Sequence, residues 1–237
     1  MKILFCVVLL LLSSCALERT RLINSGVVVT IVGIGHGSGI VVELNNEKFV
    51  LTAEHLFQNA GNATVTISWV ELNRVSGENP FGYVKTPVEI VIKDDNADLA
   101  LLRPLSRLPT RLSVLKVAHD STNLRPGTRI TVVAAPGVAP SMITEGVFVT
   151  RFIDFSTGIP FILVSAEISG GSSGGGVIYK GKLVGIVVSS DYSFNRVINT
   201  PYQTGVRARV DFLTLAVPLD VVLEFLSKAE KTLRGDQ

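Results

Sequence analysis

Short apolar segments dominate this chain, and turn-forming residues such as glycine, proline and asparagine separate each segment from the next. Many short β-branched segments at close intervals predict barrels or sandwiches of strands rather than alternating strands and helices. Asn45-Asn46 lies between two such segments and predicts a tight hairpin, because asparagine tolerates a positive φ. The predicted strands are 26–34, 40–44, 47–51, 63–70, 82–93, 99–102, 128–134, 146–152, 160–164, 176–179, 183–188 and 207–215.

These segments fall into two similar parts. A polar, proline-containing stretch over residues 103–126 connects them. After the last predicted strand, Pro218 suits the first turn of a helix, and apolar residues recur at helical spacing from Val221 to Leu226. We therefore expect two β-barrels followed by a C-terminal helix over residues 218–233.

Composition limits the classes of partner. Of the 237 residues, 47% are hydrophobic and 18% are charged, which is ordinary for a globular protein with a substantial core. The formal net charge is +2, so no basic surplus indicates nucleic-acid binding. The three histidines, His36, His55 and His119, are scattered and lack cysteine partners, so we expect no metal site and no cofactor.

The N-terminal segment differs from the rest of the chain. Lys2 precedes an apolar run over residues 3–12, which is typical of a secretory signal too short to span a bilayer permanently. Leu12-Ser13-Ser14-Cys15 also resembles a bacterial lipobox, which implies cleavage before Cys15 and attachment of lipid to it. Ordinary signal cleavage after Ala16 is the alternative. We expect a signal segment over residues 1–15 and an exported cell-envelope lipoprotein anchored to the membrane through Cys15, or otherwise a secreted protein.

The stretch Gly171-Ser172-Ser173-Gly174-Gly175-Gly176 places serines inside a run of glycines. Glycine reaches backbone angles that other residues cannot, and it lets main-chain N–H groups approach a ligand atom. A serine nucleophile needs such N–H groups beside it to bind the oxyanion that develops during its attack. Taken alone, the motif also fits a turn or a linker.

The order of residues along the chain decides which serine chemistry fits. Gly171-x-Ser173-x-Gly175 matches the nucleophile elbow of α/β-hydrolases, but that fold places its histidine after the serine, and none follows Ser173. The subtilisin order needs an aspartate before the histidine, and none precedes His55. An aspartate with His119 would satisfy that order, but His119 lies in the polar connection and lacks a parallel α/β context. The order His55, Asp98, Ser173 remains.

Taken together, these segments resemble a trypsin-like serine peptidase of the disulfide-free bacterial kind, similar to the protease domain of the HtrA family without its PDZ domains. The matching segments are Gly37-Ser38-Gly39-Ile40-Val41, Leu51-Thr52-Ala53-Glu54-His55, Asp98-Leu99-Ala100-Leu101-Leu102 and Gly171-Ser172-Ser173-Gly174-Gly175, with residues 127–137 and 182–186. The resemblance implies an all-β, chymotrypsin-like fold of two six-stranded antiparallel β-barrels with a C-terminal helix. The first barrel is expected over residues 25–115, and the second, with the helix, over residues 125–237.

The resemblance also implies a role for each residue of the site. Ser173 is the expected nucleophile, His55 the general base and Asp98 the residue that orients the imidazole. The N–H groups of Gly171 and Ser173 are expected to form the oxyanion hole.

Substrate preference is expected to depend on residues on either side of the nucleophile. Val188, Ser189 and Ser190 are expected to form the wall of the substrate pocket and to pair with an extended peptide. Glu167 lies where trypsin-like relatives place the side chain at the base of that pocket. A buried carboxylate there would favour Lys or Arg in the substrate. The alternative is an exposed glutamate at a strand end.

Three residues depart from the family pattern, among them Gly176, which replaces the usual proline after the serine motif. Glu54 replaces the small residue that usually precedes the histidine. Ser172 stands where zymogen-activated relatives carry an aspartate that pairs with a newly freed N-terminus, so we expect activity on folding or control by loop order. The glycine-rich residues 33–39 resemble a phosphate loop without its spacing or its following helix, so we expect a strand-connecting turn near the leaving-group side of the cleft.

The sequence thus supports one main hypothesis and one alternative. The hypothesis is an exported serine endopeptidase that cleaves protein or peptide substrates through an acyl-enzyme. The alternative is an inactive, protease-like module that binds peptides or envelope proteins.

Overall fold

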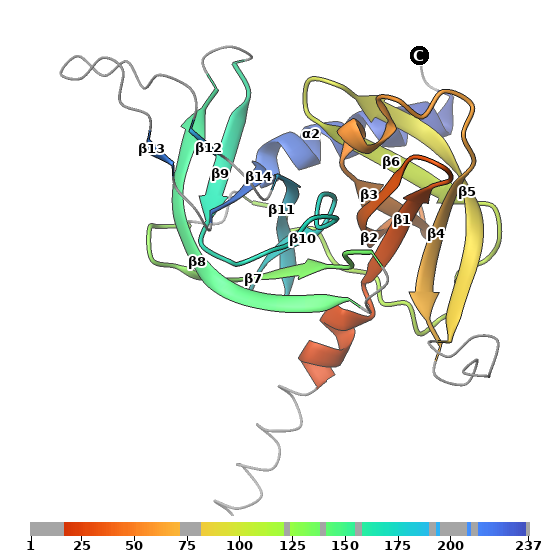
Figure 1. Cartoon of the computed structure of the whole chain (residues 1–237), viewed down its shortest axis with the longest axis horizontal. Coiled ribbons are helices and arrows are strands. Elements are labelled where there is room, and N and C mark those ends of the chain that lie inside the picture. The colour runs from red at the N-terminus through yellow and green to blue at the C-terminus, as the bar shows by residue number, and fades with distance from the viewer. Residues whose placement is uncertain are drawn as a thin grey trace, which may run out of the picture.

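Two closed antiparallel barrels, each of six strands, make up most of the molecule (Figure 1). The computed structural model describes residues 17–71, 82–120, 124–137, 141–154, 158–189, 193–194, 208–209 and 213–235. The first barrel runs in the order β1 (Gly26–Ile31), β2 (Gly35–Leu44), β3 (Glu47–Thr52), β6 (Leu99–Pro104), β5 (Tyr83–Asp94), β4 (Val65–Val70). The second runs in the order β10 (Gly176–Tyr179), β11 (Lys182–Ser189), β14 (Thr214–Pro218), β9 (Pro160–Val164), β8 (Met142–Ile153), β7 (Arg129–Ala134).

This architecture confirms the expected all-β fold of two six-stranded barrels followed by a C-terminal helix. The helix, α2 (Leu219–Arg234), begins directly after Pro218 and ends at Gly235, which has a φ of 75°. Glycine at this position suits the left-handed conformation that commonly ends a helix. Two further short strands, β12 (Ser193–Phe194) and β13 (Ala208–Arg209), pair with each other outside the barrels.

The hairpin between β2 and β3 forms as its sequence predicts. Asn45 and Asn46 occupy the turn with φ values of 50° and 64°, and Val41 pairs with Val50 across the two strands. Because side chains alternate between the faces of a strand, this register places Val41 and Val50 together in the core of the first barrel.

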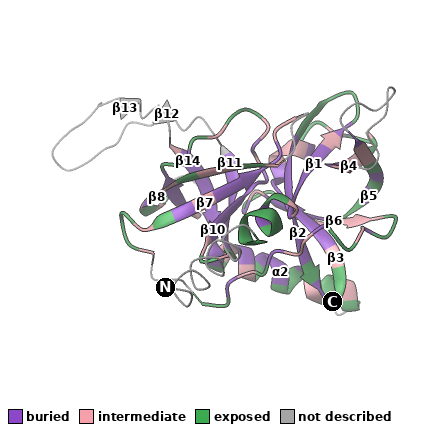
Figure 2. Cartoon of the chain, turned by 90° about the horizontal axis from the view of Figure 1, so that it is seen from below, coloured by how far each residue is buried: buried purple, intermediate pink, exposed green. Residues whose placement is uncertain are grey.

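One apolar core is continuous across both barrels and α2. Ile40 and Leu51 of the first barrel belong to the same buried cluster as Leu183 and Val217 of the second barrel and Phe225 of α2. Helix α2 contacts β5 and β6 as well as β11 and β14. Figure 2 shows buried strands of the two barrels meeting in the middle of the molecule, with α2 beside them. The apolar packing of this shared cluster therefore fixes the two barrels relative to each other.

Three expectations about the secondary structure are wrong or incomplete. The first strand ends at Ile31, and residues 32–34 form a turn with Gly33 at a φ of 82°. Residues 35–39, expected to lie in a turn, belong to β2, because their glycines permit close packing: a Cβ at Gly39 would collide with Val50. Residues 17–23 are helical, although no helix was expected before the first barrel.

The strand expected over residues 207–215 corresponds to β13 and β14, and residues 207 and 210–212 lie outside the described part of the chain. The polar connection over residues 103–126 also takes part in the fold. Leu108, Leu112 and Leu115 are buried, and Val117 forms a parallel bridge with Leu183 of the second barrel.

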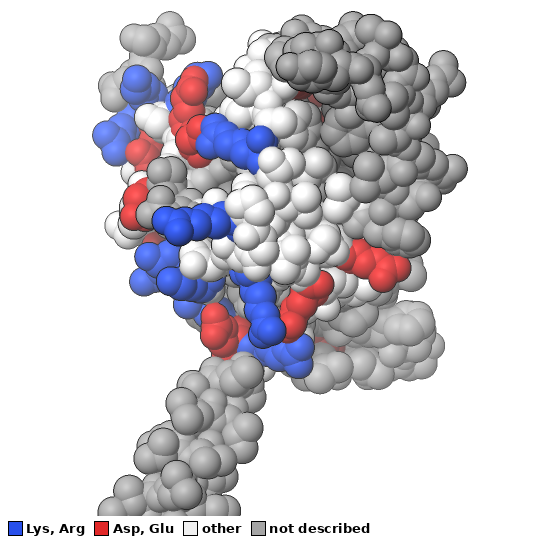
Figure 3. Space-filling model, turned by 90° about the vertical axis from the view of Figure 1, so that its left-hand side faces the viewer, with Lys and Arg blue, Asp and Glu red and all other residues white. Residues whose placement is uncertain are grey.

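Charges of both signs are interspersed on the face shown in Figure 3, where Lys and Arg lie beside Asp and Glu. Arg151 of β8 pairs with Asp220 of α2 at 2.6 Å, and Arg19 of the N-terminal helical segment pairs with Glu145 of β8 at 3.4 Å. The described residues on this face therefore form no one-sided basic patch of the kind that binds nucleic acid.

Candidate active site

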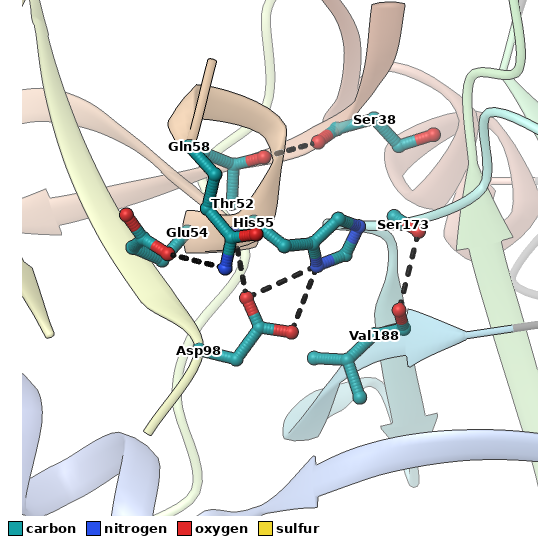
Figure 4. A network of polar contacts seen from close by, with 8 residues as sticks. All are labelled: Ser38, Thr52, Glu54, His55, Gln58, Asp98, Ser173 and Val188. Carbon is teal, nitrogen blue, oxygen red and sulfur yellow. Dashed lines mark hydrogen bonds and ion pairs between the residues drawn. The ribbon is translucent and has the colours of Figure 1, made fainter. Parts of the chain in front are cut away.

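His55 and Asp98 form the best-defined polar contact between the segments that carry the site. His55 lies in the 3₁₀ helix η1 (Glu54–Phe57), which follows β3, and Asp98 ends the turn between β5 and β6. His55 Nδ1 lies 2.8 Å from Asp98 Oδ2 and 3.0 Å from Oδ1, and the His55 backbone N–H donates to Oδ1 at 2.8 Å (Figure 4). One carboxylate therefore holds both the ring and the backbone of His55.

The turn that carries Asp98 is held at both ends. Asp98 has a φ of 52°, in the left-handed region that aspartate tolerates better than most residues. At the start of the turn, Asp94 Oδ1 accepts the backbone N–H groups of Asn96 at 3.1 Å and Ala97 at 3.0 Å. At its end, the chain enters β6 through the fully buried Leu99. These contacts direct the Asp98 carboxylate toward η1.

The surroundings of His55 favour its protonated form. The pKa of His55 lies above its usual value, chiefly because the ring hydrogen-bonds to Asp98. Partial burial opposes this, while the charges of Asp98 and then Glu54 raise the pKa further. An ionised carboxylate only accepts hydrogen bonds, so the neutral ring carries its proton on Nδ1 and leaves Nε2 free to accept one.

Ser173 lies on the loop between β9 and β10, and Figure 4 shows it near the edge of the imidazole remote from Asp98. The Ser173 hydroxyl donates to the backbone carbonyl of Val188 in β11 at 3.3 Å. Across the described residues, this is the one hydrogen bond of that hydroxyl, and none joins it to His55. In this structure the three residues of the predicted triad therefore lie close together, but only His55 and Asp98 are hydrogen-bonded to each other.

Ser38 of β2 joins the nucleophile loop to the first barrel. Its backbone N–H donates to Ser173 O at 2.7 Å, and its hydroxyl donates to Gly171 O at 2.8 Å. The same hydroxyl accepts the N–H of Ala135 at 2.8 Å, and the Ser38 carbonyl accepts the hydroxyl of Thr52 at 2.6 Å. Ser38 is fully buried, so these contacts are shielded from water. They connect both barrels at the site.

The part played by Ser38 is a feature that the sequence did not reveal. Its motif, Gly37-Ser38-Gly39, entered the family resemblance, but no role was expected for the serine. A single polar residue between two glycines beside a buried apolar strand is the signal that could have indicated it.

The glycine-rich motif leaves two N–H groups available next to the nucleophile. Three N–H groups of the motif are bonded within the loop or to β11: Ser172 to Ser169 O at 3.1 Å, Gly174 to Val187 O at 2.7 Å and Gly175 to Ser172 O at 2.9 Å. Those of Gly171 and Ser173 have no acceptor among the described residues. These two are the N–H groups expected to form an oxyanion hole.

Glycine is required at two places in this loop. Gly174 has a φ of 89°, and a Cβ there would overlap the carbonyl oxygen of Ser38. Gly171 has a φ of 87°, and a Cβ there would lie 3.0 Å from the ring of His36. The loop can therefore approach β2 closely only because these positions lack side chains.

The structure describes most, but not all, of the residues that were expected to set substrate preference. Glu167 is exposed just after β9, so its carboxylate is not buried at the base of a pocket. Val188 is buried in β11, and its carbonyl accepts the Ser173 hydroxyl. Ser189 ends β11, and Ser190, like Cys15, lies outside the described residues.

A comparison with known families assigns this arrangement. Residues 37–186, more than half of the chain, match the model of the trypsin-like peptidase domain. The chain belongs to the trypsin-like peptidase family. The matched region includes His55, Asp98 and Ser173 and parts of both barrels.

Two known proteins are similar to this trypsin-like peptidase domain. The magnetosome formation protease MamE of Paramagnetospirillum magneticum is 27% identical over 155 residues, which cover 63% of this chain and 19% of MamE. The chain thus spans about a fifth of the length of that relative. A crystal structure of Rv3671c from M. tuberculosis H37Rv, an inactive form with serine replaced by alanine, matches with a TM-score of 0.60 and 16% identity over 87% of each chain. This second likeness shows the fold.

Proposed function

We propose that the protein is an exported serine endopeptidase in which His55, Asp98 and Ser173 hydrolyse peptide bonds through an acyl-enzyme. The observation that carries the proposal is that Asp98 accepts hydrogen bonds from both the ring and the backbone of His55, next to the loop of Ser173. Catalysis by histidine requires a fixed tautomer and a fixed ring, and this contact supplies both.

In the first half of the reaction, the Ser173 hydroxyl turns from Val188 O to His55 Nε2. Its Oγ bonds to the substrate carbonyl carbon while its proton passes to Nε2, and the carbonyl oxygen becomes an anion. The free N–H groups of Gly171 and Ser173 bind that anion, and each such donor typically lowers the barrier by about 2.7–4 kcal/mol. Nε2 then gives the proton to the leaving amine as the C–N bond breaks.

In the second half, water attacks the acyl group on Ser173. The water oxygen bonds to the acyl carbon while Nε2 takes a proton from the water. The bond between Oγ and the acyl carbon then breaks, Nε2 returns the proton to Oγ, and the acid product leaves. Asp98 stabilises the imidazolium that forms in each half and does not take up a proton itself.

Activation by an ion pair with a freed N-terminus is not part of the proposal. Ser172 is buried, with 2% of its surface exposed, and its hydroxyl accepts the backbone N–H of Ser169 at 3.3 Å. The position therefore offers a hydroxyl where such activation needs a carboxylate. We propose that the folded chain becomes competent when the Ser173 hydroxyl reorients, with no cleavage beyond removal of the signal segment.

We further propose that lipid on Cys15 anchors the protein to the cell envelope. The described residues contain no helix with the length and apolar character needed to cross a membrane. Mass spectrometry of the mature N-terminus tests the anchor. A lipid-modified Cys15 is expected, whereas a free Leu17 would refute it and support ordinary secretion.

A fluorophosphonate probe tests the catalytic proposal, since it reacts with activated serines. Wild-type protein should be labelled on Ser173, and Ser173→Ala should not be labelled. Ser172→Ala is the matched control, because it removes the neighbouring hydroxyl and should leave labelling in place. Well-folded wild-type protein that resists the probe would instead favour the inactive, peptide-binding module.

A further inference from the structure

Glu54, the residue directly before His55, is a buried carboxylate that the proposed mechanism does not use. Only 1% of its side chain is exposed. Removing a carboxylate from water is unfavourable unless charged or polar partners compensate. Two partners do so here. Lys93 Nζ lies 2.7 Å from Glu54 Oε1, and Gln58 Nε2 donates to Oε2 at 3.4 Å, a contact that Figure 4 shows.

Lys93 extends this contact toward the turn that carries Asp98. It belongs to β5, and its ammonium group also lies 3.3 Å from Asp95 Oδ1, in that turn. The pKa of Lys93 is raised, first by its hydrogen bond to Glu54 and then by that to Asp95, so the group stays charged. The series Glu54, Lys93, Asp95 thus joins η1 to the Asp98 turn, beside the direct contact of His55 with Asp98.

The charges around His55 come from three elements. Across the described residues, Asp98 acts from the turn before β6 and Glu54 from η1 itself, while Lys93 of β5 pairs with Glu54. The nucleophile loop contributes the uncharged hydroxyl of Ser173. An imidazolium at position 55 is therefore influenced by two carboxylates: Asp98, which is in direct contact with the ring, and Glu54, which is paired with Lys93.

We propose that Glu54, held by Lys93, is a positioning residue for the general base: it fixes η1 against the Asp98 turn and adds a second negative charge near the imidazolium. This inference rests on the proposed function of His55. It gives a physical reason for a glutamate where the family usually has a small residue, because a small residue could neither bind Lys93 nor carry charge.

The test is an NMR titration of the histidine rings in Glu54→Gln, which removes the charge and keeps the shape. His36 and His119 are internal references in the same spectra. The His55 titration should move to lower pH by roughly half a unit, since one nearby negative charge is lost. The acid limb of fluorophosphonate labelling should move by the same amount and in the same direction.

Two further variants make the test specific. Glu224→Gln removes an exposed carboxylate that pairs with Lys228 on α2, and it should move neither curve. The double variant Glu54→Gln with Lys93→Met replaces the whole ion pair with uncharged side chains, and it serves if Glu54→Gln alone does not fold. In the double variant, too, the His55 ring should titrate at a lower pH than in the wild type.

The inference is overturned if His55 titrates at the wild-type pH in a folded Glu54 variant, even where activity falls. A uniform loss of labelling at every pH would indicate a structural role alone. Failure of the proposed function is a separate result, because wild-type protein would then resist the probe while the NMR titration still reports on Glu54.

Discussion

Asp98 accepts one hydrogen bond from the His55 ring and another from the His55 backbone, so a single carboxylate sets both the place and the tautomer of the imidazole. Asp98→Asn would keep an oxygen for the backbone N–H but turn amide hydrogens toward Nδ1. The ring would then carry its proton on Nε2 and could not accept one from Ser173. We expect the labelling rate to fall by roughly 10⁴-fold with folding retained.

The control for this prediction is Asp220→Asn. It makes the same chemical change in an ion pair with Arg151 on the second barrel, and it should be labelled at the wild-type rate. A rate for Asp98→Asn within about tenfold of wild type would contradict the assigned role of Asp98.

The pH dependence follows from the raised pKa of His55. In the proposed mechanism activity requires the neutral ring, so it should be lost as the pH falls through a midpoint above the usual histidine value of about 6.5. Labelling rate against pH measures this midpoint. A midpoint at or below the usual value would show that Asp98 does not stabilise the imidazolium in the free protein.

The raised pKa of His55 also makes the stability of the fold depend on pH, but here the effect favours low pH rather than high pH. Because the folded pKa is higher than the unfolded one, the charged pair of His55 and Asp98 contributes stability below the unfolded value of about 6.5. That contribution should decrease as the pH rises through the folded pKa. Urea unfolding of wild type and Asp98→Asn across this range measures it, and equal pH dependence in both would exclude the pair as its source.

Ser38→Ala tests the connection between the barrels. The change removes the hydrogen bond to Gly171 O and leaves the N–H of Ala135 without its acceptor, so we expect a loss of about 1–3 kcal/mol in the free energy of unfolding. Labelling should also slow by roughly tenfold, because the carbonyl of Gly171 is no longer held. Urea unfolding and labelling rates provide the two measurements.

Ser141→Ala is the comparison for Ser38→Ala. Its hydroxyl donates to Gly26 O at 3.0 Å, so it also joins the second barrel to the first, but through a bond that involves no residue of the nucleophile loop. It should lower stability with little effect on labelling. Equal slowing in both variants would mean that Ser38 acts only through general stability.

Gly174→Ala tests the need for close approach of the loop to β2. The new methyl group would overlap Ser38 O in a backbone conformation with φ of 89°. We expect loss of labelling and destabilisation by more than about 3 kcal/mol, or failure to fold. Gly35→Ala makes the same change where no atom lies within 4 Å, and it should fold and label normally. Normal labelling of Gly174→Ala would show that the loop can adopt another path.

Features that depend on local pattern or chain order were predictable from the sequence. Asn45 and Asn46 indicated their hairpin because the turn needs two residues that tolerate positive φ. The two-barrel fold followed from motif order, because strands and motifs in that sequence resemble a single family.

Features that depend on packing between distant segments could not be predicted. Gly37 and Gly39 suggested a turn, but they lie in β2 because Leu56 and Val50 pack against them. Ser38 contacts Gly171 and Ala135, and Glu54 contacts Lys93, across long stretches of the chain, and no periodic pattern in the sequence records such contacts. The helix over residues 17–23 is short, and its one buried residue, Leu22, gives no helical repeat.

The core shared by the two barrels and α2 has a consequence for how the protein loses activity. Phe225 and the strands it joins cannot separate without exposing the apolar interior of both halves. The barrels are therefore coupled into one cooperative unit, and calorimetry should record one transition rather than two. We therefore expect the protein to be either fully folded or fully unfolded. A partly unfolded form, with Ser173 in an intact second barrel and His55 in an unfolded first barrel, should not be populated.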